Sequence, residues 1–185
     1  MNLEGEQDPR LQDPNVQALM NKQKVLPNIL VTGVPGVGKT AFAQLLVAQI
    51  NEQIRLGLNM ENNANFNPFT YIAVGDVIQE KKLWTEWDHD FNCSVFDNDM
   101  VCDYLEELMY PAGGVVVDFH SSDEFPERWF DIVVLLRCKG TTVLYDRLQS
   151  RGYSEMKIKN NIECEMMNVL SDEVHEAWKP EVTLE

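Results

Sequence analysis

The sequence predicts an α/β fold, in which helices cover both faces of a five-stranded parallel sheet. Short apolar segments alternate with longer segments of helical periodicity along the chain. The segments at 115–120 and 131–137 contain apolar runs that end in charged residues, as central strands of a parallel sheet do. A glycine-rich loop at 33–40 separates the first apolar segment from the first helical one. In such folds a ligand binds at the carboxyl ends of the strands.

The length and composition are those of one soluble globular domain. The chain has 185 residues, of which 44% are hydrophobic and 24% are charged. It has no apolar run of about 18 residues, so we expect no membrane-spanning segment. The acidic N-terminus lacks the apolar core of a signal peptide, which predicts an intracellular protein.

The net charge indicates which partners the protein could bind, and the cysteine spacing indicates whether it has a zinc site or disulfides. The 30 acidic and 15 basic residues give a net charge of −15, which disfavours binding to a nucleic-acid backbone. A basic protein, such as a ribosomal protein, is the better electrostatic match, and an equally good alternative is that the acidity only serves solubility. The four cysteines are scattered without a C-x-x-C pair, which argues against a zinc site and a disulfide framework.

The first third of the chain is predicted to contain a disordered extension, a strand and a helix. Residues 1–24 are largely polar and show little apolar periodicity, which predicts disorder. Ile29–Thr32 reads as a short buried strand, and a helix begins at Ala41 and continues to about Arg55. Residues 56–68 are rich in asparagine, which is typical of a surface insertion.

The middle of the chain is predicted to hold one strand and two helices. A strand is expected at 70–74, followed by a turn at Gly75-Asp76 and a short helix from about Val77. A second helix is expected to begin after a cap at Asp97 or Asn98 and to end at the segment 111–114. Between the two helices, residues 83–96 mix aromatic and acidic side chains with no clear period.

The last third continues the alternation. Strands are expected at 115–120 and 131–137. They are followed by a helix that Thr141 or Thr142 caps and that ends at Gly152, and by a long helix that begins after the cap Ser154 and ends at Pro180. A fifth strand is expected at 182–184. With this order the glycine loop, Asp76, Asp118 and His120 all fall at the carboxyl ends of strands.

The glycine loop fits the phosphate-binding pattern G-x-x-x-x-G-K-[ST] without a mismatch. Gly33, Gly36 and Gly38 have no β-carbon, so the backbone can turn with positive φ and bring N–H groups close to an anion at the start of a helix. Lys39 would reach the β- and γ-phosphates, and the Thr40 hydroxyl would ligate a magnesium ion that bridges them. The alternative is a glycine turn that happens to contain Lys-Thr. The flanking strand and helix favour binding of a nucleoside triphosphate.

Asp118 and His120 end the third predicted strand. A carboxylate at this place can hold a magnesium ion beside the glycine loop. His120 follows two residues later and faces the same way in an extended strand, so it can lie near the γ-phosphate or an attacking water. The alternatives are an ordinary strand-end acid and a surface histidine.

Arg147 and Arg151 are spaced to project from one face of a helix. Phosphoryl transfer spreads negative charge over the γ-oxygens, and two guanidinium groups over them would stabilise it. Residues 151–153 could form a small hinged lid that excludes water. The alternative for Arg147 is a position on the helix surface, paired with Asp146.

Several motifs together resemble one known family. They are Pro27-Asn28-Ile29, the glycine loop, Val74-Gly75-Asp76, Asp118-Phe119-His120, Phe125-Pro126-Glu127-Arg128-Trp129, Leu144-Tyr145-Asp146-Arg147-Leu148 and Arg151-Gly152-Tyr153. On these motifs, the chain from about Leu26 to Leu184 resembles the adenylate kinase isoenzyme 6 family of coilin-interacting nuclear ATPases. The aspartate-x-histidine and phenylalanine-proline-glutamate-arginine motifs are much narrower than the glycine loop alone.

The resemblance implies a three-layer P-loop nucleoside monophosphate kinase fold over residues 25–185, with adenylate kinase and ATPase activities. It implies ATP, Mg²⁺ and AMP as ligands, a basic small-subunit ribosomal protein as partner, and a part in maturing the small ribosomal subunit in nucleus and cytoplasm. We expect a monomer that binds no nucleic acid directly. The residues implied for ATP are Gly33, Gly36, Val37, Gly38, Lys39, Thr40, Ala41 and Arg151, with Mg²⁺ on Thr40 and Asp118. The implied AMP-binding region is about 73–96, including Gly75 and Asp76, and the implied lid is about 150–160.

The chain departs from the family's pattern in three ways. The N-terminal extension and the asparagine-rich insertion are additions to it. Gln79 stands where relatives often carry an arginine. The chain also ends where the family continues into an adenine-side loop and a terminal helix, so we expect the C-terminus to be truncated.

Three functions remain open from the sequence. The first is a magnesium-dependent phosphotransferase that moves the γ-phosphoryl group of ATP to AMP and also hydrolyses ATP. Its catalytic residues would be Lys39, Asp118, His120, Arg147 and Arg151. The second is an ATP-driven switch that binds and releases a basic ribosomal protein with little AMP kinase activity. The third is a catalytically inactive binding module.

Overall fold

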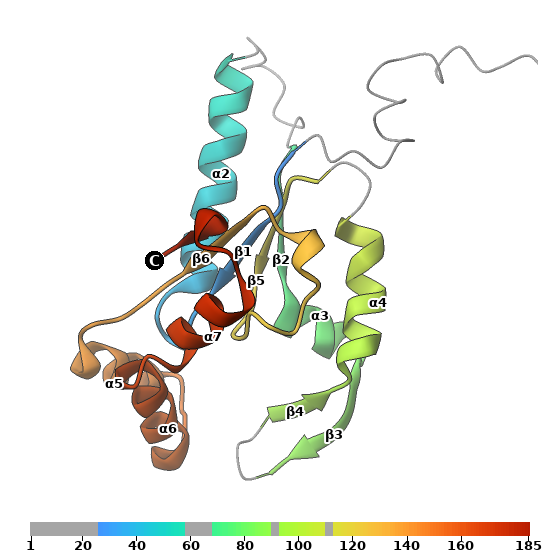
Figure 1. Cartoon of the computed structure of the whole chain (residues 1–185). Coiled ribbons are helices and arrows are strands. Elements are labelled where there is room, and N and C mark those ends of the chain that lie inside the picture. The colour runs from blue at the N-terminus through green and yellow to red at the C-terminus, as the bar shows by residue number, and fades with distance from the viewer. Residues whose placement is uncertain (1–25, 58–67, 90–92, 110–112) are drawn as a thin grey trace, which may run out of the picture.

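The computed structural model describes residues 26–57, 68–89, 93–109 and 113–185 (Figure 1). The strands are β1 (Ile29–Thr32), β2 (Thr70–Ala73), β3 (Trp84–Asp88), β4 (Cys93–Phe96), β5 (Val115–Asp118), β6 (Ile132–Leu135) and β7 (Thr183–Leu184). The helices are α2 (Lys39–Gly57), α3 (Val74–Lys81), α4 (Asn98–Met109), α5 (Thr141–Ser150), α6 (Glu155–Met166) and α7 (Val169–Ala177), with 3-10 turns at Glu127–Trp129 and Pro180–Val182.

Five strands form one parallel sheet in the order β2-β5-β1-β6-β7, and β3 and β4 form a separate antiparallel hairpin. In the sheet, Leu30 of β1 lies between Val117 of β5 and Val133 of β6. The predicted α/β fold with a five-stranded parallel sheet is confirmed.

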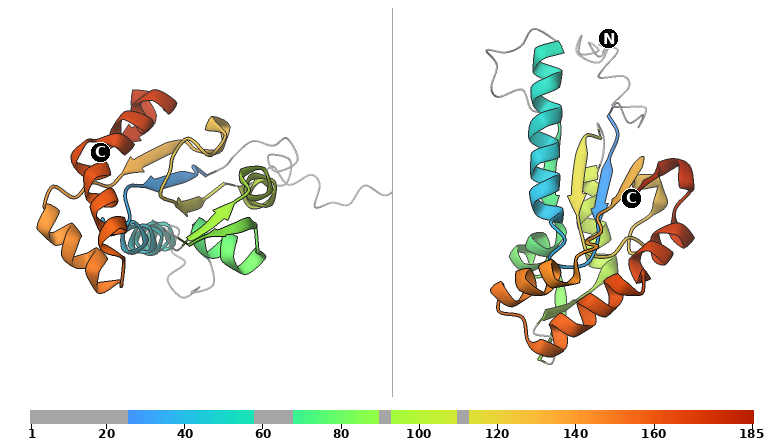
Figure 2. Two further views of the ribbon diagram at one scale, coloured as in Figure 1. Left: turned by 90° about the horizontal axis from the view of Figure 1, so that it is seen from below. Right: turned by 90° about the vertical axis from the view of Figure 1, so that its left-hand side faces the viewer.

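Helices pack on both faces of the sheet, because successive strand side chains point to opposite faces. In β1, Leu30 belongs to the apolar cluster that includes residues of α4 and α7, whereas Ile29 and Val31 belong to the cluster that includes residues of α2 (Figure 2). A third cluster joins Val34 of the glycine loop to α5 and α6. The predicted helical layers are therefore present on both faces.

Two arms project from the same end of the sheet. The strands of the sheet end toward the glycine loop, and Figure 1 shows α5 and α6 on one side of this end and the β3–β4 hairpin on the other. The arms therefore flank the carboxyl ends of the strands, where a ligand is expected.

The structure differs from the predicted elements in the middle of the chain. β2 ends at Ala73, so Gly75 and Asp76 lie in the first turn of α3 and the predicted turn before that helix is wrong. The segment with no clear period contains the β3–β4 hairpin, whose register shifts between Trp84 and Glu86. That irregularity adds a residue to one strand and breaks the alternation that would have revealed it.

Two helix boundaries also differ. Gly140 is the N-cap of α5 and no side chain caps this helix, so the predicted caps Thr141 and Thr142 are wrong. The predicted long helix after Ser154 is two helices, because Asn168 adopts a left-handed φ of 59° between α6 and α7. Asparagine tolerates this conformation better than most residues. The Ser154 cap itself is confirmed, since its side chain accepts a hydrogen bond from the Lys157 backbone N–H.

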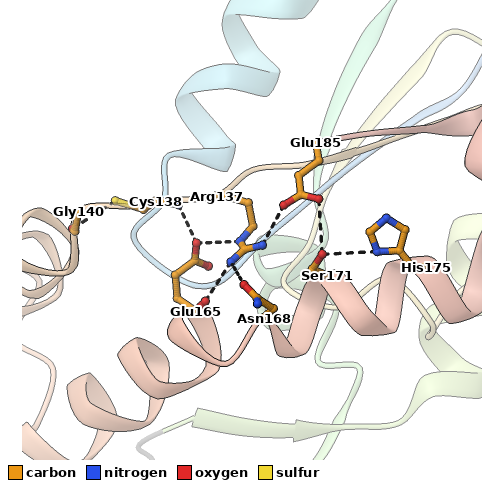
Figure 3. Close-up of polar contacts among 8 residues, drawn as sticks. All are labelled: Arg137, Cys138, Gly140, Glu165, Asn168, Ser171, His175 and Glu185. Atoms are coloured by element: carbon orange, nitrogen blue, oxygen red, sulfur yellow. Dashed lines mark hydrogen bonds and ion pairs between the residues drawn. The ribbon is translucent and has the colours of Figure 1, made fainter.

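A polar joint, formed by Arg137, Glu165, Asn168 and Glu185, ties the end of β6 to the corner between α6 and α7 (Figure 3). Arg137 donates 2.9 Å hydrogen bonds to the carboxylates of Glu165 and Glu185, and it also donates to the Asn168 side chain. The Glu165 carboxylate accepts a further bond of 2.8 Å from the backbone N–H of Cys138. Glu165 is only 5% exposed, so the joint anchors the far end of the α5–α6 arm.

The predictions of disorder at 1–24 and of an insertion at 56–68 fall wholly or mostly outside the described residues. Among the helices that the structure does describe, none is long and apolar enough to cross a bilayer.

Candidate functional site

The glycine loop between β1 and α2 has the backbone conformation that its sequence predicts. Gly33, Gly36 and Gly38 have φ values of 143°, 92° and 114°. A β-carbon on Gly33 would lie 2.4 Å from the carbonyl oxygen of Leu136, whereas one on Gly38 would meet open space. The loop is therefore packed tightly on its sheet side and open on the side where α2 begins.

Lys39 lies over this loop. Its Nζ donates hydrogen bonds to the carbonyl oxygens of Gly33 and Val34, at 2.7 and 3.2 Å. Burial lowers the pKa of Lys39 to about 8, with Asp118 opposing the shift and Arg151 adding to it. Burial thus disfavours the charged ammonium of Lys39 in the ligand-free protein, and an anion bound beside it would stabilise that charge.

Thr40 and Asp118 form an oxygen pair beside the loop. Thr40 Oγ1 donates a 2.6 Å hydrogen bond to Asp118 Oδ2, which also accepts one of 3.1 Å from the Tyr71 hydroxyl. Burial and the Asp118 charge raise the pKa of Tyr71 to about 12, so the phenol stays protonated and donates. Tyr71 is a site residue that the sequence reasoning missed. The available signal was a phenol next to the apolar pair Ile72 and Ala73 in strand β2, which pairs with β5.

The oxygen pair fits a magnesium ion. Mg²⁺ prefers hard oxygen ligands, keeps several waters, and is usually bound through one or two carboxylates plus substrate phosphates. A hydroxyl and a carboxylate oxygen 2.6 Å apart at the pocket wall match that donor set. Across the described ranges, no group of three His, Cys, Asp or Glu side chains gathers to hold a metal ion. Phosphate oxygens and water would therefore complete the shell.

Two pockets meet at this site. The smaller, of about 300 Å³, lies over the start of α2 and is lined by Gly36, Gly38, Lys39, Thr40, Ala41, Gln44 and Arg151. The larger, of about 460 Å³, extends past Asp118 and His120 to α3, the hairpin and Tyr153. Lys39, Thr40 and Arg151 line both pockets. Gln44, one helical turn after Thr40, was also missed from the sequence.

His120 follows β5 and lines the larger pocket together with Asp118. Its ring centroid lies 4.2 Å from that of Phe119. The side chain remains open to solvent at the pocket, yet partial burial, followed by the charge of Lys39, holds the pKa of His120 below its ordinary value. Asp118 opposes this shift, and Lys157 adds to it. The imidazole is thus neutral at neutral pH.

The two predicted arginines, Arg147 in α5 and Arg151 directly after it, take different places. Arg147 donates hydrogen bonds of 3.1 and 3.2 Å to the carbonyl oxygens of Gly36 and Val37, so it braces the glycine loop through its backbone. Arg151, the C-cap of α5, lies where the two pockets meet. Of these two arginines, only Arg151 lines the pockets and is positioned to contact a phosphate.

The other side of the larger pocket is formed by α3 and the hairpin. Gly75 and Asp76 line it, together with Gln79 and Ser94, whose side chains share a 2.8 Å hydrogen bond. This bond joins α3 to β4. Gln79 thus contributes a neutral side chain to the lining of the pocket.

The register of the hairpin places two tryptophans on the same face as two residues of this pocket. Trp84 lies opposite Phe96 and Trp87 opposite Ser94, and residues directly opposite in an antiparallel pair share a face. Phe96 and Ser94 line the larger pocket. Trp84 and Trp87 are 36% and 40% exposed and lie outside the pocket lining, so this face of the hairpin carries exposed aromatic surface next to two lining residues.

The fold, the glycine loop at the start of α2 and the Thr40–Asp118 pair define a P-loop nucleotide kinase-like protein. A family model described as an AAA domain matches residues 29–168, and an adenylate kinase isoenzyme 6 homolog of Caenorhabditis elegans is 45% identical over 86% of this chain and 78% of its own length. The chain belongs to the adenylate kinase isoenzyme 6 family. Identity is 40% to the Dictyostelium discoideum homolog, over 90% of this chain and 84% of that protein. Identity is 31% to the Saccharomyces cerevisiae homolog FAP7, over 90% of this chain and 75% of that protein.

Proposed function

We propose that this protein transfers the γ-phosphoryl group of ATP to AMP. The observation that supports this most is the junction of the two pockets at Lys39, Thr40 and Arg151. A donor in the smaller pocket and an acceptor in the larger one would bring their phosphates to the same three side chains. Phosphoryl transfer depends mainly on such positioning and on charge stabilisation.

The donor side is suited to a triphosphate. Backbone N–H groups of the loop and of the first turn of α2 would bind the phosphate oxygens, and Lys39 would exchange its two carbonyl partners for them. Arg151 would approach from α5. A magnesium ion held by Thr40 and Asp118 would neutralise charge on the transferred group.

The acceptor side is suited to a nucleoside monophosphate. The pocket of about 460 Å³ lies within the range of ligand sites, and Asp76, Gln79 and Ser94 offer it polar groups. Neutral His120 can accept a hydrogen bond from the acceptor or from a water in its place. We therefore propose ATP hydrolysis as a second activity, with water as acceptor.

Initial rates of ADP formation, measured with and without AMP, test the proposal. Wild-type protein is expected to form ADP slowly from ATP alone and faster with AMP, with two ADP produced per AMP consumed. Lys39→Ala should abolish both rates, which controls for contaminating enzymes. A rate that is indifferent to AMP at all concentrations would contradict the kinase assignment.

A second candidate is an ATP-driven switch acting in small ribosomal subunit maturation. The net charge of −15 supports it, because an acidic surface favours a basic ribosomal protein as partner. Such a role would place the protein in nucleus and cytoplasm. ATP-dependent release of a bound basic small-subunit ribosomal protein, with no response to AMP, would favour the switch over the kinase.

A further inference from the structure

The short segment that carries His120 is fixed at both of its ends. On one side Phe119 is buried, and its backbone N–H donates a 3.1 Å hydrogen bond to the carbonyl oxygen of Val31 in β1. On the other side Ser122 is completely buried. Only His120 and Ser121 lie between these two anchors, so the backbone at His120 has little freedom to rotate.

Helix α7 and the residue that ends it hold Ser122 by all three of its polar groups. The backbone N–H and the hydroxyl of Ser122 donate hydrogen bonds of 2.7 and 2.9 Å to the same oxygen, Oε1 of Glu173. The Ser122 carbonyl oxygen accepts a 3.3 Å bond from Nε1 of Trp178. Two of the three bonds therefore depend on one carboxylate.

The packing of α7 has other support. The Trp178 ring lies 6.0 Å from the Phe130 ring, and Val174 is fully buried in the core. The joint at Arg137 holds the beginning of the helix through Asn168. Loss of the Glu173 carboxylate would thus leave α7 in place and release the segment that follows His120.

From these contacts we infer that Glu173 is a positioning residue for His120, an inference that rests on the proposed function. Glu173 lies outside the lining of both pockets and acts through Ser122. By fixing Ser122 it holds the imidazole beside Asp118, facing the acceptor. Ser121 adds to this, because its hydroxyl lies 3.3 Å from the same Glu173 oxygen and donates to Asp123 at 2.7 Å.

The test compares Glu173→Ala with Glu173→Gln, and uses Glu176→Ala, an exposed position on the same helix, as the matched control. The amide oxygen of glutamine can still accept both Ser122 bonds. The kcat of Glu173→Gln for ADP formation should therefore stay within about threefold of the wild-type value. Glu173→Ala should lower kcat by about tenfold to a hundredfold, because small misplacements of a catalytic group have effects of that size. The KM for ATP should not change, since the glycine loop is untouched.

A second measurement does not depend on activity. The imidazole proton signals of the three histidines can be followed by NMR in nucleotide-free protein, with His120 assigned from His120→Asn and His89 as internal reference. Glu173→Ala should shift or broaden the His120 signal while that of His89 stays in place. This readout remains informative even if AMP proves not to be the acceptor.

Several outcomes would overturn the inference. One is an unchanged His120 signal in folded Glu173→Ala, and another is an unchanged kcat. A third is an equal loss in Glu173→Gln, or a loss of ATP binding that parallels kcat, since either would indicate a general structural role. If Glu173→Ala does not fold, Ser122→Ala, which removes only the hydroxyl donor, should reduce kcat several-fold with ATP binding retained, and no reduction would refute the proposal.

Discussion

Thr40 and Asp118 are joined by a 2.6 Å hydrogen bond that links the first turn of α2 to the end of β5. The bond places a hydroxyl and a carboxylate oxygen together at the wall of the larger pocket, and the hydroxyl also lines the smaller one. Since these elements are far apart in the sequence, the pair exists only because β1 and β5 are neighbours in the sheet.

The first prediction concerns Asp118→Asn. The amide keeps the shape and can still accept the Thr40 bond, but it removes the negative charge that a magnesium ion needs. We expect the gain in ATP affinity on adding Mg²⁺ to disappear and turnover to fall by about a hundredfold or more. Calorimetric titration with and without Mg²⁺ measures this, and Asp103→Asn, an exposed position on α4, is the control. An undiminished magnesium effect would exclude Asp118 as a ligand.

The second prediction is a pH dependence of ATP binding. In the ligand-free protein Lys39 loses its proton near a pKa of about 8, and bound phosphate raises that pKa by favouring the ammonium. Affinity should therefore change little between about pH 7 and 8 and weaken by up to tenfold per pH unit above pH 8. Titrations in two buffers of different ionisation enthalpy should also show proton uptake on binding above pH 8. A dissociation constant that stays level through this range would contradict the assignment.

The third prediction contrasts two glycines of the loop. A β-carbon on Gly36 would lie 2.9 Å from Leu144 and 3.1 Å from Leu148, at a φ of 92°, whereas one on Gly38 meets open space at a φ of 114°. Gly36→Ala should lower the free energy of unfolding by about 2–4 kcal/mol through clash and strain. Gly38→Ala should lower the free energy of unfolding by only about 1–2 kcal/mol, because it adds strain without a clash. Urea unfolding measures both.

ATP binding separates the two glycines further. The β-carbon on Gly38 would project toward the space where the phosphates are proposed to lie, so Gly38→Ala should weaken ATP binding more than its loss of stability accounts for. If Gly38→Ala bound ATP as well as wild type, the polyphosphate would have to lie elsewhere.

The fourth prediction concerns the aromatic face of the hairpin. Stacking of a base on an aromatic side chain contributes about 1–3 kcal/mol, so Trp84→Ala and Trp87→Ala should each raise the KM for AMP by about tenfold and leave the KM for ATP unchanged. Val95→Ala on the opposite face is the matched control. Trp129 and Trp178 are buried, so AMP-dependent fluorescence changes would report on the hairpin. Equal effects of all three variants would argue against a role for this face.

The fifth prediction concerns the joint at Arg137. Glu165→Ala would remove the partner of a partly buried guanidinium and of the Cys138 N–H, and should lower the free energy of unfolding by about 3 kcal/mol. Glu165→Gln keeps an acceptor for both and should cost about 1 kcal/mol. Thermal and urea unfolding of the two variants measure the difference. A larger loss in the glutamine variant would contradict this account.

Sequence reasoning succeeded where the signal is local. The glycine loop, the apolar runs of β1, β5 and β6 and the Ser154 cap each depend on residues close together in the chain. It failed where the signal needed the tertiary structure. Tyr71 reaches Asp118 only because β2 pairs with β5, and Arg147 braces the loop only because α5 packs on it. The hairpin was hidden because an extra residue near Trp84 disrupts the alternation of its side chains.

The bracing of the glycine loop by α5 limits where the arm can move. Leu144 and Leu148 pack beneath the loop and Arg147 holds its carbonyl groups, while Glu165 fastens the far end of α6 to Arg137. Any swing over the nucleotide must therefore be taken up at Gly152, whose φ is 75°, or else break the joint at Arg137. An arm tethered at two points keeps Arg151 where the two pockets meet in the ligand-free protein. The rate of nucleotide entry and exit would then be governed by diffusion and by the Lys39 contacts rather than by the opening of a gate.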